Sequence, residues 1–169
     1  SSPTHSYMKA LYKYPQAEFP YAWLCQENQS RGRLQPEFEL IDTGIFKEDR
    51  YFDVVVEYAK GDVEDILIRV TVTNRGPDAA PITVLPSLWF RNTWSWDPNA
   101  PRPAITLESG NTMRAVHPEI GEYTLRYQVG GHDVEPLFTE NETNYQRLFN
   151  AMNRTPYVKD AFHRYVVNG

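Results

Sequence analysis

The chain has 169 residues, a formal net charge of −5 and a pI near 5.4. It carries no basic stripe, so we expect no nucleic-acid partner. No apolar run approaches about 18 residues, so we expect no membrane-spanning helix. The single cysteine, Cys25, excludes an internal disulfide and a multi-cysteine zinc site. We expect it to be a buried, inert thiol in the reducing cytoplasm.

Aromatic residues make up 14% of the chain, and 13 prolines interrupt it. Aromatic side chains favour pleated sheets, and prolines disfavour long helices. The length suits a single domain over 1–169. Both ends look cut, because the chain begins abruptly and stops directly after an apolar run. We therefore expect a fragment of a longer, multidomain chain.

The first third contains one predicted helix. Residues 7–14 fit either a helical face or a paired strand, and Pro15 ends either one. A helix is predicted over 19–33, with Pro20 in its first turn and Gly32 at its end. Arg31 and Arg33 are expected in its last turn, where cations complement the helix dipole.

From Pro36 onward the pattern becomes β-rich. A short strand is predicted from Phe38, Leu40 and Ile45. Strict alternation then predicts two antiparallel strands over 52–58 and 66–73, joined by a loop of five to seven residues as a hairpin. The charged stretch 47–50 is expected to be a solvated turn.

The remaining elements are expected at a spacing of about ten residues, which is typical of β proteins. Strands are predicted over 82–89, 104–108, 112–117, 122–129 and 134–139. A helix is predicted after 139–144, capped by Thr139 or Asn141. A final strand is predicted over 162–167. The whole indicates a mainly β fold, an antiparallel β-sandwich with one or two short helices.

An aromatic cluster at 89–96 contains three of the four tryptophans, with Arg91 and Asn92 between them. Two interpretations stand. The rings fit a corner of the core, because tryptophan is a large hydrophobe whose N–H needs a partner. They also fit a sugar site, because ring faces pack on C–H patches while Arg and Asn bond hydroxyls. On the first interpretation Trp89 is core, and Trp89→Ala would cost about 3–5 kcal/mol.

Catalytic and metal-binding patterns are weak. Glu140 and Glu142 would share one face of an extended strand about 7 Å apart, which falls within the separation used by inverting glycosidases. Nothing in their neighbourhood desolvates either carboxyl, so we do not expect catalysis from them. The four histidines, His5, His117, His132 and His163, lack metal-ligand spacing. We expect no metal and no cofactor.

Seven stretches, taken together and in order, resemble a known family. The most specific are LWFRNTWSW at 88–96 and FTENETN at 138–144, and the others lie at 5–9, 11–16, 39–44, 49–54 and 157–160. They resemble the amino-terminal region of large bacterial glucosidase-like proteins of glycoside hydrolase family 63. The processing α-glucosidase of N-glycan maturation belongs to the same family.

The resemblance implies an inverting α-glycosidase in which an amino-terminal β-supersandwich joins an (α/α)6 barrel that holds the catalytic acid and base. This chain is too short to contain the barrel, so it implies no catalytic residue here. The implied role is a non-catalytic sandwich domain that supports the barrel and borders its sugar pocket. The barrel and an α-glucoside oligosaccharide are the implied partners. The residues expected to border the pocket are Arg91, Asn92, Trp94, Trp96, Glu140 and Asn141.

Two alternatives remain open on the residues alone. A free-standing carbohydrate-binding module would need Trp94 and Trp96 exposed on a groove. A structural or protein-interaction β domain would show a large exposed apolar patch.

Overall fold

The structure is a computed structural model that describes residues 1–97, 99–131 and 134–169. His132 therefore lies outside the described residues. The chain divides into two compact units, Ser1–Val84 and Leu85–Gly169. The prediction that 1–169 forms a single domain within a longer chain stays a prediction.

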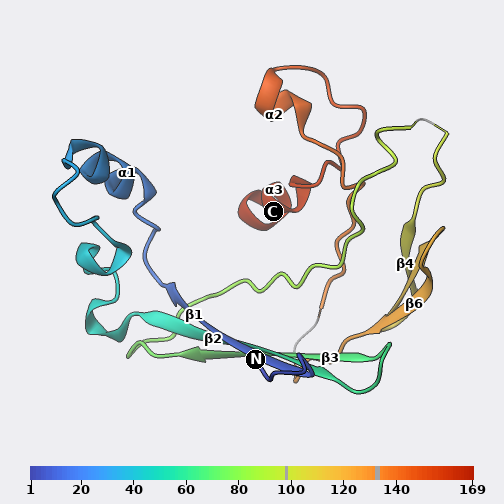
Figure 1. The fold of residues 1–169 in the computed structure, drawn as a ribbon, viewed down its shortest axis with the longest axis horizontal. Helices are drawn as coiled ribbons and strands as arrows, with labels where there is room; N and C mark the ends of the chain where they lie inside the picture. The colour runs from blue at the N-terminus through green and yellow to red at the C-terminus, as the bar shows by residue number, and fades with distance from the viewer. Residues whose placement is uncertain (98, 132–133) are drawn as a thin grey trace. The chain divides into compact units, whose positions relative to one another are not determined.

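Unit 1 contains a three-stranded antiparallel sheet of order β1-β2-β3, drawn as one layer in Figure 1. The strands are β1 (Tyr7–Pro15), β2 (Tyr51–Lys60) and β3 (Ile66–Asn74). The predicted hairpin is confirmed, with β2 and β3 joined by residues 61–65. Residues 7–14 form a strand, and β1 ends at Pro15, as one of the two interpretations held.

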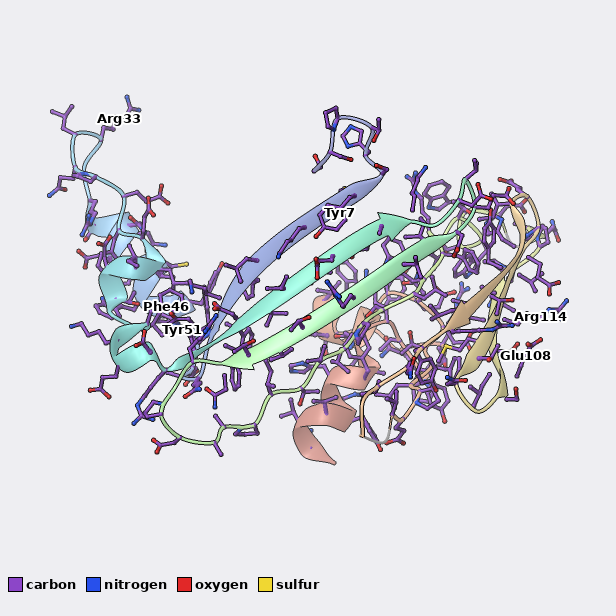
Figure 2. The ribbon with its side chains drawn as sticks, turned by 90° about the horizontal axis from the view of Figure 1, so that it is seen from below. Tyr7, Arg33, Phe46, Tyr51, Glu108 and Arg114 are labelled. Carbon is purple, nitrogen blue, oxygen red and sulfur yellow. The ribbon has the colours of Figure 1, made fainter. Side chains whose placement is uncertain are left out.

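The strand registers give this sheet two different faces. Because side chains alternate along a strand, the paired residues Ala10, Val56 and Val70 lie on one face. We call this the apolar face; it comprises Met8, Ala10, Tyr12, Tyr14, Phe52, Val54, Val56, Tyr58, Ile66, Ile68, Val70 and Val72, with the polar Lys60 and Asn74 at its two ends. We call the opposite side the polar face, because Lys13, Asp53 and Glu57 lie on it. Tyr7, labelled on β1 in Figure 2, belongs to the polar face.

The predicted first helix is confirmed as α1 (Tyr21–Ser30), with Pro20 at its N-cap. Arg31 is the C-cap residue, so the expected cations in the last turn are absent from α1. Its guanidinium instead binds Glu27, four residues earlier, at 3.1 Å. Arg33 lies beyond the helix, as Figure 2 shows. Cys25 is partly exposed rather than buried.

The predicted strand through 38–45 is wrong. These residues instead contain a 3-10 helix, η1 (Leu40–Thr43). The local side chains explain it: Glu39 and Asp42 form a capping box, and Thr43 donates its hydroxyl to the Leu40 carbonyl at 2.6 Å. Gly44 ends the helix at φ 72°, a conformation that disfavours every residue with a Cβ. The expected turn at 47–50 contains a second 3-10 helix, η2 (Lys47–Asp49).

Unit 2 contains the second antiparallel sheet, of order β4-β5-β6. Its strands are β4 (Ala104–Ser109), β5 (Thr112–His117) and β6 (Gly121–Arg126), which confirms three of the predicted strands. Arg114 on β5 binds Glu122 on β6 through two guanidinium nitrogens. The mainly β, antiparallel class is confirmed by the two three-stranded antiparallel sheets.

Two predicted strands do not form. Residues 82–89 and 134–139 have no strand assignment. Pro86 removes a backbone donor inside the first stretch, and Pro136 does the same in the second. Both segments do contain alternating apolar residues, but neither forms backbone hydrogen bonds with a neighbouring strand.

The two carboxyl-terminal helices differ from expectation in different ways. The predicted helix is present as α2 (Tyr145–Phe149), but its cap is Asn144 rather than Thr139 or Asn141. The expected final strand is wrong, because α3 (Ala161–Asn168) occupies it. Phe162, Tyr165 and Val166 follow the i, i+3, i+4 spacing of a helix, which the strand prediction overlooked.

The buried apolar side chains are few among the described residues: Phe52 in unit 1 and Trp94, Ala115 and Val158 in unit 2. Trp89 is 65% exposed, so the expectation that it belongs to the core is wrong. Within the part of the chain that the structure describes, no helix is long and apolar enough to cross a bilayer.

Candidate functional site

The two most specific stretches of the sequence meet in unit 2. The Asn92 side-chain amide donates to the Asn141 carbonyl at 2.9 Å, and the Asn141 amide donates to the Phe90 carbonyl at 2.7 Å. The indole N–H of Trp94 donates to a carboxylate oxygen of Glu142 at 3.2 Å. We call this contact the junction; it comprises Phe90, Asn92, Trp94, Asn141 and Glu142.

The junction contains one closed turn and one residue in an unusual backbone conformation. Asn92 also accepts a hydrogen bond from the Ser95 backbone at 3.1 Å, which closes the turn between the tryptophans. Asn141 has φ 51°, in the left-handed region where asparagine is among the few tolerated residues. The Asn92 amide therefore bonds backbone groups through both its nitrogen and its oxygen, and the Asn141 amide does so through its nitrogen.

A third segment joins the junction from the carboxyl-terminal side. The Glu140 N–H donates to the Tyr157 carbonyl at 2.8 Å, and the Lys159 N–H donates to the Glu142 carbonyl at 2.9 Å. Val158, between them, is 1% exposed. Residues 140–142 and 157–159 thus form a short paired stretch around one buried valine.

Beside the junction lies a polar network around Asn144. Its Oδ1 accepts the Arg147 backbone N–H at 3.0 Å and the Asn153 amide at 3.1 Å. Its Nδ2 donates to Asp160 at 3.0 Å. Arg147 binds the same carboxylate at 2.9 Å and, with Asn144, holds the pKa of Asp160 below its ordinary value. The network ties the start of α2 to the start of α3.

The predicted pocket residues divide into two groups. Trp94 is buried, and Asn92 and Asn141 are half-buried within the junction. Arg91, Trp96 and Glu140 are exposed, and the Arg91 guanidinium lies 5.4 Å from the centre of the Trp96 ring. Arg91 directly precedes Asn92, and Glu140 directly precedes Asn141. The junction therefore brings the backbones of these two exposed residues close together.

Sequence reasoning missed the Asn144 network as a site feature. Asn144, Arg147 and Asp160 belong to the quoted motifs or adjoin them, but their contact depends on the fold between 144 and 160. The same loop borders an open hollow of about 430 Å3. It is lined by Gln146, Asn150, Asn153, Arg154 and Arg164, among others, and contains none of the predicted site residues.

The described histidines and carboxylates offer no evident catalytic pair. Glu142 is engaged by Trp94, and His117 packs its ring 5.1 Å from that of Phe90. Within the described ranges, no group of three or more His, Cys, Asp or Glu side chains is placed to hold a metal ion.

Comparison with known proteins gives one informative relative. The whole chain aligns with the uncharacterized protein YMR196W of Saccharomyces cerevisiae at 37% identity over 202 residues. The alignment covers 19% of that protein, so the chain spans about a fifth of the length of the curated relative it matches. No family model and no solved structure matches the chain.

Proposed function

We propose that this chain is a non-catalytic, amino-terminal β region of a glycoside hydrolase similar to family 63. In this role it supports a catalytic (α/α)6 barrel elsewhere in the same protein and borders its α-glucoside pocket. The observation that carries the proposal is the junction, because it joins the two stretches on which the family resemblance chiefly rests. The greater length of the yeast relative supports a longer protein. The bacterial origin and the cytoplasmic location belong to the same proposal.

The exposed residues at the junction suggest how it would border a sugar. Trp96 presents 70% of its surface, and Arg91 stacks against it. A ring face can pack on the C–H patch of a glucosyl unit, and a guanidinium or carboxylate can bond its hydroxyls. Asn92, Trp94 and Asn141 would act as positioning residues, because their side-chain nitrogens already donate hydrogen bonds within the protein.

The proposal is tested on the full-length natural protein with an α-glucoside substrate. Trp96→Ala should raise KM about 5- to 30-fold, the equivalent of about 1–2 kcal/mol of lost contact, and leave kcat within about threefold. Trp89→Ala is the matched control, because Trp89 is similarly exposed but is not one of the residues proposed to border the pocket. Absence of α-glucoside hydrolysis by the full-length protein would reject the proposal.

A free-standing carbohydrate-binding module remains the second candidate, favoured by the exposed Trp96 alone. It predicts that α-gluco-oligosaccharides change the tryptophan fluorescence of the 169-residue chain. It also predicts that Trp96→Ala removes this change. Trp94 contributes little to this candidate, because its ring is buried rather than displayed on a groove.

A further inference from the structure

The open hollow beside α2 and α3 carries positive charge without a matching negative charge. Two of its lining residues are arginines, Arg154 and Arg164, and no aspartate or glutamate is among the described residues that line it. Neither arginine forms an ion pair with a described residue. The hollow therefore presents two guanidinium charges that the described part of the protein does not neutralise.

The segment around the hollow is basic, although the chain as a whole is acidic. Residues 143–169 contain four basic residues, Arg147, Arg154, Lys159 and Arg164, against one acidic residue, Asp160, which gives a formal charge of +3. The whole chain has a charge of −5, which leaves −8 for residues 1–142. A compact anion is attracted by such a local excess of positive charge, whereas an acidic chain disfavours a long polyanion such as nucleic acid.

Hydrogen bonds hold the wall of the hollow in place. Asn153 accepts the Gln146 backbone N–H at 3.0 Å and donates to Asn144 at 3.1 Å, which fastens the loop after α2 to the start of that helix. On α3, Arg164 donates from Nη2 to the Pro156 carbonyl at 3.0 Å. This bond uses one of the five N–H donors of the guanidinium, so the group is oriented while its other donors remain available.

Neutral polar groups complete the lining. The side-chain amides of Gln146 and Asn150 border the hollow and form no hydrogen bond with a described residue. The Thr155 hydroxyl oxygen accepts the Tyr157 backbone N–H at 3.2 Å, so its own O–H can still donate. An amide both donates and accepts, which suits the hydroxyl groups of a ligand.

Charge and size together select the class of ligand. A phosphomonoester carries about 1.5 to 2 negative charges at pH 7 and three acceptor oxygens, which matches two guanidinium groups. A carboxylate carries a single charge and would leave one guanidinium unmatched. The hollow of about 430 Å3 lies within the range of about 300–1,000 Å3 that small-molecule sites occupy. It therefore has room for an organic remainder besides the phosphoryl group.

We propose that this hollow binds a small phosphomonoester. Its phosphoryl group is held by Arg154 and Arg164, and its hydroxyl-bearing remainder lies against the amides of Gln146 and Asn150. None of the junction residues lines the hollow, so this is a second site. The inference does not depend on α-glucoside hydrolysis, and its test uses no α-glucoside.

The test is equilibrium dialysis of the full-length natural protein with isotope-labelled glycerol phosphate. We expect saturable binding that glycerate, the carboxylate of similar size, displaces about tenfold less well or worse, because it forms fewer charged hydrogen bonds. Uncharged glycerol should not displace the label. Absence of binding at millimolar glycerol phosphate would overturn the inference, and so would displacement by glycerate as effective as that by unlabelled glycerol phosphate.

Two variants locate the binding. Arg154→Gln and Arg164→Gln should each weaken the affinity for glycerol phosphate about 10- to 100-fold, the equivalent of one lost set of charged hydrogen bonds. Arg102→Gln is the matched control, because Arg102 is an exposed arginine of the same unit that does not line the hollow.

Arg154→Gln decides the matter if Arg164→Gln does not fold, because the Arg154 side chain forms no hydrogen bond with a described residue that its loss would break. Unchanged affinity in Arg154→Gln would overturn the inference. Equal weakening by Arg102→Gln would also overturn it, because the protein would then respond only to its net charge.

Discussion

Trp94 is the best-anchored aromatic residue of the junction. Its ring is 8% exposed, and its indole N–H is hydrogen-bonded to Glu142. Trp89 and Trp96, at 65% and 70% exposed, lack that burial. Of these three tryptophans, Trp94 therefore packs in the interior, whereas Trp89 and Trp96 lie at the surface.

This difference predicts unequal costs of truncation. Trp94→Ala should lower the free energy of unfolding by about 3–5 kcal/mol, because it removes a buried ring and leaves a void. Trp89→Ala should cost less than about 1 kcal/mol. Urea melts of the two variants measure both values. Equal costs would show that the junction does not depend on Trp94.

Asp53 gives the polar face a dependence on pH. Its hydrogen bond to Lys13, and then that to Arg75, hold the pKa of its carboxyl below the ordinary value of 3.8. A lowered pKa in the folded state stabilises the fold above the pKa of the unfolded chain. This contribution is lost as the pH falls through the lowered folded value.

We therefore predict that the melting temperature of the chain falls as the pH is lowered below about 4, and falls less in Asp53→Asn. Thermal melts at pH 7 and at lower pH measure the difference. Asp62→Asn is the control, because Asp62 lies in the exposed loop after β2 and forms no ion pair among the described residues. An identical pH dependence in Asp53→Asn and the natural chain would contradict the prediction.

At the scale of elements, Asn144 links two helices. Its side chain caps α2 through Arg147 and also reaches Asp160, which is the N-cap residue of α3. A helix as short as α2 depends on such tertiary contacts, since isolated short helices are unstable in water.

Asn144→Ala should thus cost about 1–2 kcal/mol, the upper range for loss of an N-cap. It should also increase amide exchange at the starts of both α2 and α3. Thr139→Ala is the control, because Thr139 is one of the two caps that the sequence suggested and the structure does not use. Hydrogen exchange measured by mass spectrometry follows the amides of both helices. Unchanged protection at α3 would show that α3 does not depend on the Asn144 network.

At the scale of the whole molecule, the exposed area is large. The chain exposes 13763 Å2. Two separate compact bodies of half its mass would together expose about 10,000 Å2. Because even two fully separated compact units would expose less, the excess lies within the units themselves. The exposed apolar face of the β1-β2-β3 sheet is one part of it.

This area predicts a small heat-capacity change when the isolated 169-residue chain unfolds. Apolar surface that is already exposed adds nothing to it, so the value should lie below the usual 12 cal/mol/K per residue or so. Differential scanning calorimetry measures it. A value at or above that level would mean that the isolated chain buries its apolar side chains as a self-contained domain does.

Strong local signals were sufficient for several elements. These elements are the alternating strands β2 and β3, the start of α1 at Pro20 and the strands at 104–117. In each of them the residue propensities, the hydrophobic pattern and the final fold agree. Capping chemistry was ambiguous, because Thr139, Asn141 and Asn144 all suit an N-cap. Only the contact with Asp160 and Asn153 selects the third.

The sequence by itself determined the mainly β class, the hairpin and the stretches that deserve a functional test, because periodicity and turn chemistry are local properties. Only the tertiary structure decided that Trp94 rather than Trp89 is buried, that 162–167 is a helix, and that residues about fifty positions apart form the junction. Burial and hydrogen-bond partners depend on which segments meet, and no spacing along the chain specifies that meeting.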